Sequence, residues 1–262
     1  MLNPRIIPCL LVKDKGLVKT INFKNPKYVG DPINAVRIFN EKEVDELIVL
    51  DIDATPEKRD PDYKMIEHLA NECRMPLCYG GGIKTVDQAE TIIGLGVEKV
   101  AISSAAIENP KLITIITEHI GNQSVVIVLD VKRNLLCDMY EVYTHNGQKK
   151  TGKCLLELAQ QMEKLGAGEI VINSIDNDGT MKGYDLALVE KIRESISVQL
   201  TILGGAGSLD DIGQVINKYG VIGVAAGSLF VFKGVYRAVL INYPNRAEKD
   251  ALIKENCHIT EY

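Results

Sequence analysis

The chain has 262 residues, which suits one large α/β domain or two small ones. Its formal net charge of −5 at pH 7 argues against a nucleic-acid-binding or polybasic membrane-binding surface. No apolar run reaches the roughly 18–20 residues of a membrane helix, and the first residues lack a signal-peptide pattern, so we expect a cytoplasmic protein.

Short apolar runs rich in β-branched residues alternate with longer amphipathic segments along the whole chain. Such runs fit strands that are buried on both faces of a parallel sheet. Asp31 before Pro32, and Thr85 further on, are suitable helix N-caps. We predict strands over residues 6–12, 46–52, 76–79, 99–103, 124–131, 169–174, 199–203 and 223–226, and helices over 32–40, 63–72, 86–95, 110–120, 154–165, 187–196, 209–218 and 234–242.

Eight strand–helix units in about 250 residues are typical of the (β/α)8 TIM barrel, in the α/β class. One offset of 123 residues separates Glu46 from Glu169 and Gly82 from Gly205, which indicates duplicated half-barrels. We therefore predict a single barrel domain over residues 1–262, with half-barrels at about 1–122 and 123–262. A doubly wound open sheet is the alternative, although no GxGxxG motif follows the first predicted strand.

Two excursions interrupt the alternation. Residues 13–30 form a long segment with few expected core positions, and segments of this length are often lids. Lys19 within it is either an anion ligand or a solvated lysine, and the residues alone favour neither. Residues 138–152 contain the alternating run MYEVYT before Asn146-Gly147, a strong hairpin-turn signal. We expect a surface hairpin on the rim, with a substrate or partner contact as the alternative.

Glycine turns follow two of the predicted strands. Glycine lets backbone N–H groups approach an anion, and a following helix N-terminus adds favourable potential. Because the active sites of such barrels lie in the loops after the strands, the doubled arrangement predicts two phosphate sites for one bisphosphorylated ligand. The turns are Gly80-Gly81-Gly82 and Gly204-Gly205-Ala206-Gly207, and the next strand of each half ends at Ser103-Ser104 or Gly227-Ser228.

Aspartates are the second feature of the strand ends, and Asp130 is the most firmly placed because it ends the apolar run VVIVL. Carboxylates at a barrel mouth can exchange protons with a substrate. The duplication aligns Leu11 with Asp130, so only one half carries an acid at this position. The other candidates are Asp51, Asp53, Asp176 and Asp178, of which Asp53 and Asp176 are better explained as caps or partners of loop lysines.

The potential metal ligands lack the spacing of a metal site. None of the six cysteines forms a CxxC pair, and the four histidines show no metal-ligand pattern. A scattered set of cysteines in a chain of this size is typical of reduced, structural thiols. We therefore predict no metal and no cofactor.

A series of motifs runs in order along nearly the whole chain: RIIPCL, VKTINF, DELIVLDI, YGGGI, KVAISSAAIENP, EVYTHNGQKKTG, GAGEIVINSIDNDGTMKGYD and GGAGSL. Together they resemble the cyclase subunit of imidazole glycerol phosphate synthase, the HisF family, a lyase-type synthase of histidine biosynthesis. The resemblance implies a duplicated (β/α)8 barrel and a heterodimer with a glutaminase subunit, which docks opposite the active site. Ammonia passes through the barrel in that family and reacts at the strand C-terminal ends with a bisphosphorylated ribulosyl formimino substrate.

The resemblance also assigns roles to single residues. Without it, the charged residues of the proposed gate are interpreted as a salt-bridge ring. The resemblance implies an ammonia gate of Arg5, Glu46, Lys99 and Glu169, with Glu98 as a docking residue for the partner. It implies catalytic roles for Lys19, Asp51 and Asp130, and substrate or phosphate binding by Gly82, Ser104, Asp178, Gly179, Gly205 and Ser228. The strand-end pattern adds Ser103 and Gly227 to the predicted phosphate-binding residues.

The departures from the family pattern lie at the mouth. The first catalytic aspartate of the family falls on Leu11, and a phosphate-binding asparagine falls on Ser103. Family serines fall on Ala101 and Leu203. An alkyl side chain cannot transfer a proton, and the loss of one acid or base typically costs about 10²–10⁴-fold in rate.

Three functions are compatible with this pattern. The favoured one is a diverged paralogue that receives ammonia but passes it to sugar amidation in surface-polysaccharide synthesis, alongside a separate amidotransferase. The second is the classical cyclase–lyase, with another group, of which Asp14 is the nearest, replacing the missing acid. The third is a non-catalytic barrel that only activates a glutaminase. In each case the expected ligand is a phosphorylated small molecule, with no nucleic-acid or membrane partner.

Overall fold

The computed structural model describes residues 3–134 and 139–256. Cys137, Asp138, Cys257 and His258 lie outside the described residues, and with them the first residue of the predicted 138–152 hairpin. Among the described residues, none of the helices combines the length and apolar character needed to cross a bilayer.

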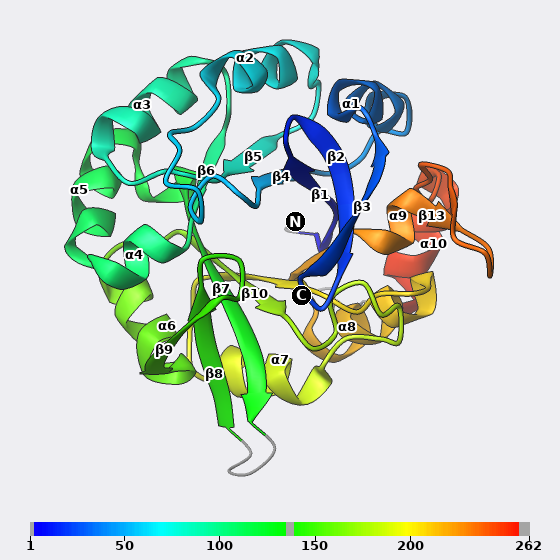
Figure 1. Cartoon of the computed structure of the whole chain (residues 1–262). Helices are drawn as coiled ribbons and strands as arrows, with labels where there is room; N and C mark the ends of the chain where they lie inside the picture. Colours follow the sequence, from blue (N-terminus) through cyan, green and yellow to red (C-terminus); the bar gives the residue numbers. More distant parts are fainter. Residues whose placement is uncertain (1–2, 135–138, 257–262) are drawn as a thin grey trace.

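Eight parallel strands close into a ring, which confirms the predicted TIM barrel (Figure 1). Each strand pairs in parallel with its neighbour, and the pairing of β7 with β10 and of β12 with β1 leaves no free edge. The apolar runs lie where both strand faces are covered, by helices outside and by barrel side chains inside. The strands are β1 (Arg5–Lys13), β4 (Leu47–Asp51), β5 (Leu77–Gly80), β6 (Lys99–Ile102), β7 (Val125–Asn134), β10 (Glu169–Ser174), β11 (Gln199–Leu203) and β12 (Gly223–Ala226).

Amphipathic helices surround the ring and bury their apolar faces against it. Two predicted N-caps are confirmed, because Asp31 accepts from the Asn34 amide at 2.8 Å and Thr85 forms a reciprocal capping box with Gln88. The outer helices are α1 (Pro32–Glu41), α2 (Tyr63–Glu72), α3 (Val86–Gly94), α5 (Lys111–Ile120), α6 (Leu155–Lys164), α7 (Leu186–Arg193), α8 (Leu209–Tyr219) and α10 (Arg246–Asn256).

The helix predicted over 234–242 is wrong. Gly234 has a φ of +73°, which ends regular structure, and the flanking residues form a short antiparallel pair, β13 (Phe232–Lys233) with β14 (Ala238–Val239). The side-chain amide of Asn242 donates to the Leu229 and Leu240 carbonyls, and the eighth outer helix is α10 instead. Three short elements also escaped prediction: α4 (Ser104–Glu108), α9 (Ser228–Val231) and the 3-10 turn η1 (Asn122–Ser124).

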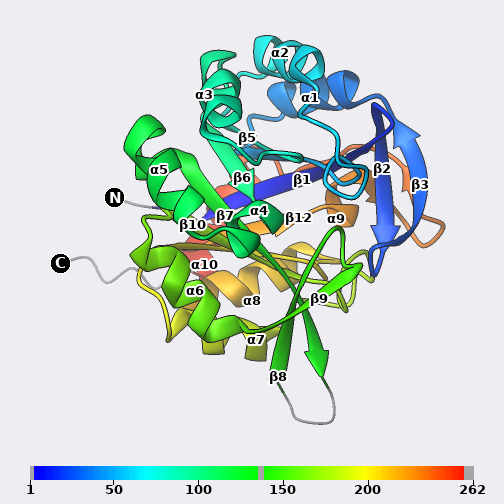
Figure 2. The same cartoon turned by 60° about the vertical axis from the view of Figure 1, so that its left-hand side comes forward.

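Two hairpins stand at the end of the barrel where the eight strands terminate, here called the mouth; the opposite end is the base (Figure 2). The first excursion is a hairpin of β2 (Gly16–Ile21) and β3 (Lys24–Gly30) rather than a loop with few core positions, because Leu17 and Val18 are buried. The second confirms the predicted hairpin, with β8 (Met139–Thr144) and β9 (Lys149–Cys154) flanking Asn146-Gly147.

Candidate functional site

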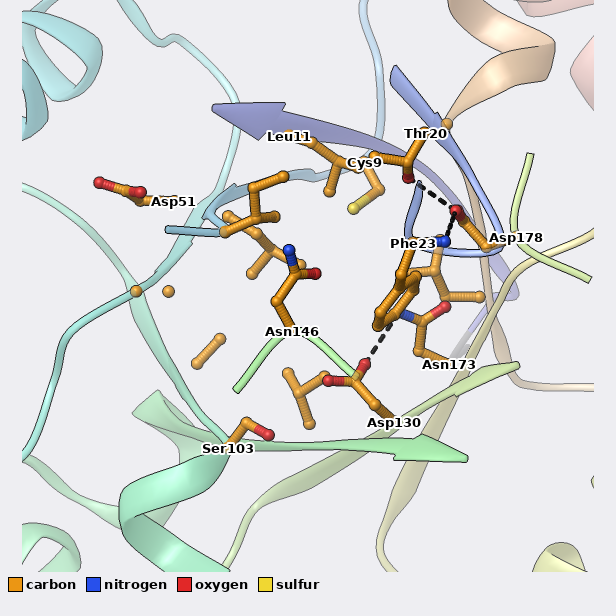
Figure 3. A pocket seen from close by; sticks show the side chains of 18 of the residues that line it. Cys9, Leu11, Thr20, Phe23, Asp51, Ser103, Asp130, Asn146, Asn173 and Asp178 are labelled. Atoms are coloured by element: carbon orange, nitrogen blue, oxygen red, sulfur yellow. Dashed lines mark hydrogen bonds between the residues drawn. The ribbon is translucent and has the colours of Figure 1, made fainter. Parts of the chain in front are cut away.

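A cavity opens at the mouth, with a volume of about 1100 Å³ including its open side. Side chains and backbone from both half-barrels converge on it, and the two hairpins contribute Phe23 and Asn146 (Figure 3). The structure brings all the predicted catalytic and substrate-binding residues to this one cavity: Lys19, Asp51, Gly82, Ser103, Ser104, Asp130, Asp178, Gly179, Gly205, Gly227 and Ser228.

The glycine turns line opposite sides of the cavity, one from each half-barrel. Gly205 shows why glycine is needed: its φ is +117°, and a Cβ there would lie 2.1 Å from the Gly183 carbonyl oxygen. The close approach of the Gly183 backbone therefore requires glycine at this position. Anion binding by the two turns stays a prediction.

The two short helices start at predicted phosphate residues, α4 at Ser104 and α9 at Ser228, both buried. Ser104 Oγ accepts from the His145 amide at 3.1 Å, which ties the β8–β9 hairpin to the mouth. The neighbouring Ser103 Oγ is buried and has no hydrogen-bond partner in the described part of the chain. A hydroxyl in that condition can accept a ligand hydrogen bond at little cost.

Lys19 is only 5% exposed, so the prediction of a solvated lysine does not hold. Its ammonium donates to the Cys9 carbonyl oxygen at 2.6 Å, and burial lowers the Lys19 pKa against the raising effects of Cys9 and Asp178. The ammonium lies directly against Gly227, where a Cβ would stand 2.3 Å away. A buried cation held at a cavity wall is suited to an anionic ligand.

Asp130 and Asp178 lie on one side of the cavity (Figure 3). Burial raises the Asp130 pKa to about 7, with a smaller raising effect from the Asp178 charge and an opposing hydrogen bond from Asn173 at 3.0 Å. Burial also raises the Asp178 pKa, although Asp178 accepts from the Thr20 hydroxyl at 2.7 Å and the Phe23 amide at 3.2 Å. A carboxyl with a pKa near neutrality can act as either acid or base.

Asp51 also lines the cavity, but its carboxylate is engaged elsewhere. It accepts from the Asp53 and Ala54 amides at 3.2 and 3.1 Å and from the Arg59 guanidinium at 3.3 Å. In Figure 3 it lies on the far side of the cavity from Asp130. This arrangement fixes the loop after β4, and a catalytic role for Asp51 stays a prediction.

Alkyl side chains line the centre of the cavity. Leu11 of β1 stands in register with Leu50 of β4, whereas Asp130 of β7 stands in register with Asn173 of β10. The first-half pair is therefore apolar where the second-half pair is polar. Ala101, Val128 and Leu203 add to the apolar lining.

At the base, four charged side chains form a closed ring of ion pairs. Arg5 contacts Glu46 and, at 2.8 Å, Glu169; Lys99 donates to both glutamates at 2.8 Å. Burial alone would raise the Glu169 pKa, but the charges and hydrogen bonds of Arg5 and Lys99 lower it instead. The salt-bridge ring predicted for these residues is therefore present, and Thr201 joins it by donating to Glu169 at 2.5 Å.

Two further acidic features lie outside the cavity lining. The exposed Glu98 accepts from the Leu77 amide at 2.7 Å, so the predicted docking residue also caps the start of β5. Asp14, Asp53 and Glu57 form a group with oxygen atoms close enough to share a cation, although Lys13 already contacts Asp53. Exposed acidic groups of this kind are common without a metal.

Sequence reasoning missed three cavity residues, namely Thr20, Phe23 and Asn173. Thr20 and Phe23 lie on a hairpin whose sequence gives little strand signal and therefore predicts a loop. Asn173 had a usable signal: the 123-residue offset aligns it with Leu50, so a polar residue replaces an alkyl one beside Asp130.

The comparisons with known proteins identify the family of the chain. Residues 5–237 match the family described as "Histidine biosynthesis protein". A protein of Leptospira borgpetersenii named "Putative imidazole glycerol phosphate synthase subunit HisF" is 60% identical over 96% of this chain and 99% of its own. A Vibrio vulnificus protein with the corresponding name, hisF3, is 59% identical over 95% and 96%. The "Imidazole glycerol phosphate synthase subunit HisF" of Streptococcus sanguinis is 42% identical over 88% and 91%.

Proposed function

We propose the following function for this chain, which belongs to the histidine biosynthesis protein family and is a HisF-type subunit of imidazole glycerol phosphate synthase. A subunit of this synthase is expected to have a partner subunit. We infer that this partner is a glutaminase docked on the base, that the complex works in the cytoplasm, and that ammonia enters through the ring at the base. At the mouth, we infer, ammonia meets a phosphorylated ligand in a site that has diverged from the classical chemistry.

The ring at the base supports the ammonia part of the proposal. Arg5, Lys99 and the two glutamates satisfy one another, so they close the interior without leaving an unpaired charge. Above the ring, the interior is lined by apolar side chains and thiols such as Cys9 and Cys78. A passage of this character suits neutral ammonia better than ammonium, because burying a charge is costly.

The mouth supports an anionic ligand. Glycine turns from both half-barrels face the same cavity, together with the buried Lys19 and the Ser103 hydroxyl, which has no partner among the described residues. Two backbone anion sites on opposite walls fit a ligand with two phosphate groups better than a ligand with one. This is the reason to retain a bisphosphorylated small molecule as the ligand class.

The pair of Leu11 and Leu50 carries the divergent part of the proposal. Both residues have alkyl side chains where the second half has Asp130 and Asn173. A mechanism that uses one acid from each half therefore lacks the acid of the first half. The chain is 60% and 59% identical to the two HisF proteins whose printed names begin with "Putative", but only 42% identical to the HisF of Streptococcus sanguinis. We therefore propose that the ammonia is passed to sugar amidation in surface-polysaccharide synthesis, together with a separate amidotransferase.

One assay tests this against the classical reaction. The purified chain is given the ribulosyl formimino substrate with a high ammonium concentration, and imidazole glycerol phosphate is measured. We expect turnover at least about 10²-fold below that of a HisF with both acids. Robust turnover, unchanged by Leu11→Asp, would establish the classical cyclase–lyase and overturn the diverged function.

A second measurement separates an ammonia-delivering subunit from a barrel that only activates a glutaminase. The chain, its glutaminase and the separate amidotransferase are combined with the sugar acceptor and with glutamine that is labelled at its amide nitrogen. Transfer of the label to the sugar supports delivery. Glutaminase stimulation without label transfer, in an amidotransferase that works with free ammonium, would favour the activating barrel.

A further inference from the structure

Asn173 lies beside the mouth carboxyl Asp130 on the neighbouring strand. The two residues are directly in register between β7 and β10, and Asn173 Nδ2 donates to Asp130 Oδ1 at 3.0 Å. Asn173 is only 5% exposed, whereas Asp130 is partly exposed to the cavity. The amide therefore holds one carboxylate oxygen from the barrel wall, as Figure 3 shows, and leaves the other oxygen toward the cavity.

The orientation of this amide is set by its contact with the Asp130 carboxyl. The Oδ1 atom of Asn173 is buried and has no hydrogen-bond partner among the described residues. It faces the first glycine of the second turn, since a Cβ on Gly204 would lie 3.4 Å from it. If the amide were turned over, its oxygen would meet an ionised carboxylate, which is unfavourable.

The two halves of the barrel supply an internal comparison. Leu11 occupies the position of Asp130 in the first half, and its register partner there is Leu50, the counterpart of Asn173. Where the acid is absent, the amide is absent too. A buried amide is not needed for packing at this position, because leucine fills the equivalent one.

We propose that Asn173 is a positioning residue for Asp130: its amide aims the carboxyl into the mouth and stabilises the ionised form. This role rests on the proposed function, in which Asp130 is the remaining acid or base of the mouth. The other groups around Asp130 are Asp178 after β10, Cys9 of β1, Lys19 of β2 and Tyr143 of β8, which stands in register with it. Unlike these groups, Asn173 is a neutral side chain that donates a hydrogen bond to the Asp130 carboxylate.

The test is a direct titration of Asp130 that needs neither substrate nor partner. The Asp130 carboxyl is followed by carbon-13 NMR from pH 4 to 9 and assigned by its loss in Asp130→Asn. In Asn173→Leu, which is close in volume and removes the donor, we expect the midpoint to rise by about one pH unit. Asn173→Thr keeps a donor on a side chain suited to a strand, so its midpoint should lie nearer the native one.

The matched control is Asn40→Leu, which removes an asparagine amide that donates to the Glu72 carbonyl at 2.7 Å, far from the mouth. It should lower thermal stability and leave the Asp130 midpoint unchanged. If Asn173→Leu also lowers stability without moving the midpoint, Asn173 is only structural and the proposal is overturned. If Asn173→Leu does not fold, an unshifted midpoint in Asn173→Ala overturns it equally. A shifted midpoint in a chain without ammonia transfer would leave this inference standing and count against the proposed function alone.

Discussion

Asp130 is the mouth carboxylate that its surroundings neutralise least. Asp51 is held by two backbone amides and by Arg59, and Asp178 by a hydroxyl and an amide. Asp130 has one neutral donor, and burial, with a smaller effect of the Asp178 charge, raises its pKa to about 7. A carboxyl that is half protonated near neutrality has access to both roles in proton transfer. The chemistry left at this mouth therefore centres on one residue rather than on a pair.

Asp130→Asn should make the protein more stable at neutral pH. The folded-state pKa of about 7 lies above the ordinary value of 3.8. Ionisation of Asp130 therefore lowers the free energy of unfolding progressively between about pH 4 and pH 7, and the full loss remains above pH 7. The variant keeps an acceptor for the Asn173 amide and removes this cost. We expect a gain of about 1–4 kcal/mol in the free energy of unfolding at pH 8, smaller at pH 5.5.

Urea unfolding at the two pH values measures this gain. The control is Asp14→Asn, because Asp14 is exposed and has a φ of +48°, which asparagine also tolerates. Its effect should be small and nearly the same at both pH values. A gain in Asp130→Asn that does not grow with pH would contradict a raised pKa.

The strands of the barrel were predictable from sequence, whereas the shorter elements at the mouth were not. Strands such as β7 carry apolar runs that only a doubly covered strand can bury, so each predicted strand overlaps an observed one. The β2–β3 hairpin lacks such a run because β3 is largely exposed, and its sequence predicts a loop instead. The four- and five-residue helices α9 and α4 are too short for a periodic signal. Gly234–Asn242 had apolar residues at helical spacing, but Gly234 and the exposed Val235 and Tyr236 belong to a turn.

Gly213 provides a test of how the true eighth helix is held. The structure packs α10 against α8, and a Cβ on Gly213 would lie 2.9 Å from Asn256 Nδ2 and 3.1 Å from Leu252 Cδ1. Gly213→Leu should therefore push α10 off the barrel and lower the free energy of unfolding by about 1–3 kcal/mol. Limited proteolysis should then cleave within residues 246–256 before the rest of the chain.

The same substitution at Gly94 is the control, because a Cβ on Gly94 would meet no atom of the described chain within 4 Å. Gly94→Leu should leave proteolysis unchanged, since the end of α3 has room for the side chain. Equal protection of residues 246–256 in both variants would show that the contact with Gly213 does not hold α10.

The whole barrel separates two polar systems by an apolar interior. The ion-pair ring lies at the strand starts and Asp130 lies within β7 at the mouth, and β7 and β10 connect the two. Glu169 is in register with Val126, four residues before Asp130, a separation of roughly 13 Å along the strands. Apolar residues such as Val128 and Val171 fill the space between them. Ends separated in this way can diverge independently, so the base can keep its ring while the mouth changes its chemistry.

A double-mutant cycle at pH 8 tests this independence. Glu169→Gln leaves Arg5 and Lys99 with an unbalanced buried charge and should destabilise by about 3–5 kcal/mol. Asp130→Asn should stabilise, as argued above. Sites more than about 7–10 Å apart without shared partners usually combine within about 0.5 kcal/mol, so the double variant should show the sum of the two effects. A coupling above about 1 kcal/mol would mean that the ring senses the charge at the mouth through the barrel, and the two ends could not then have diverged separately.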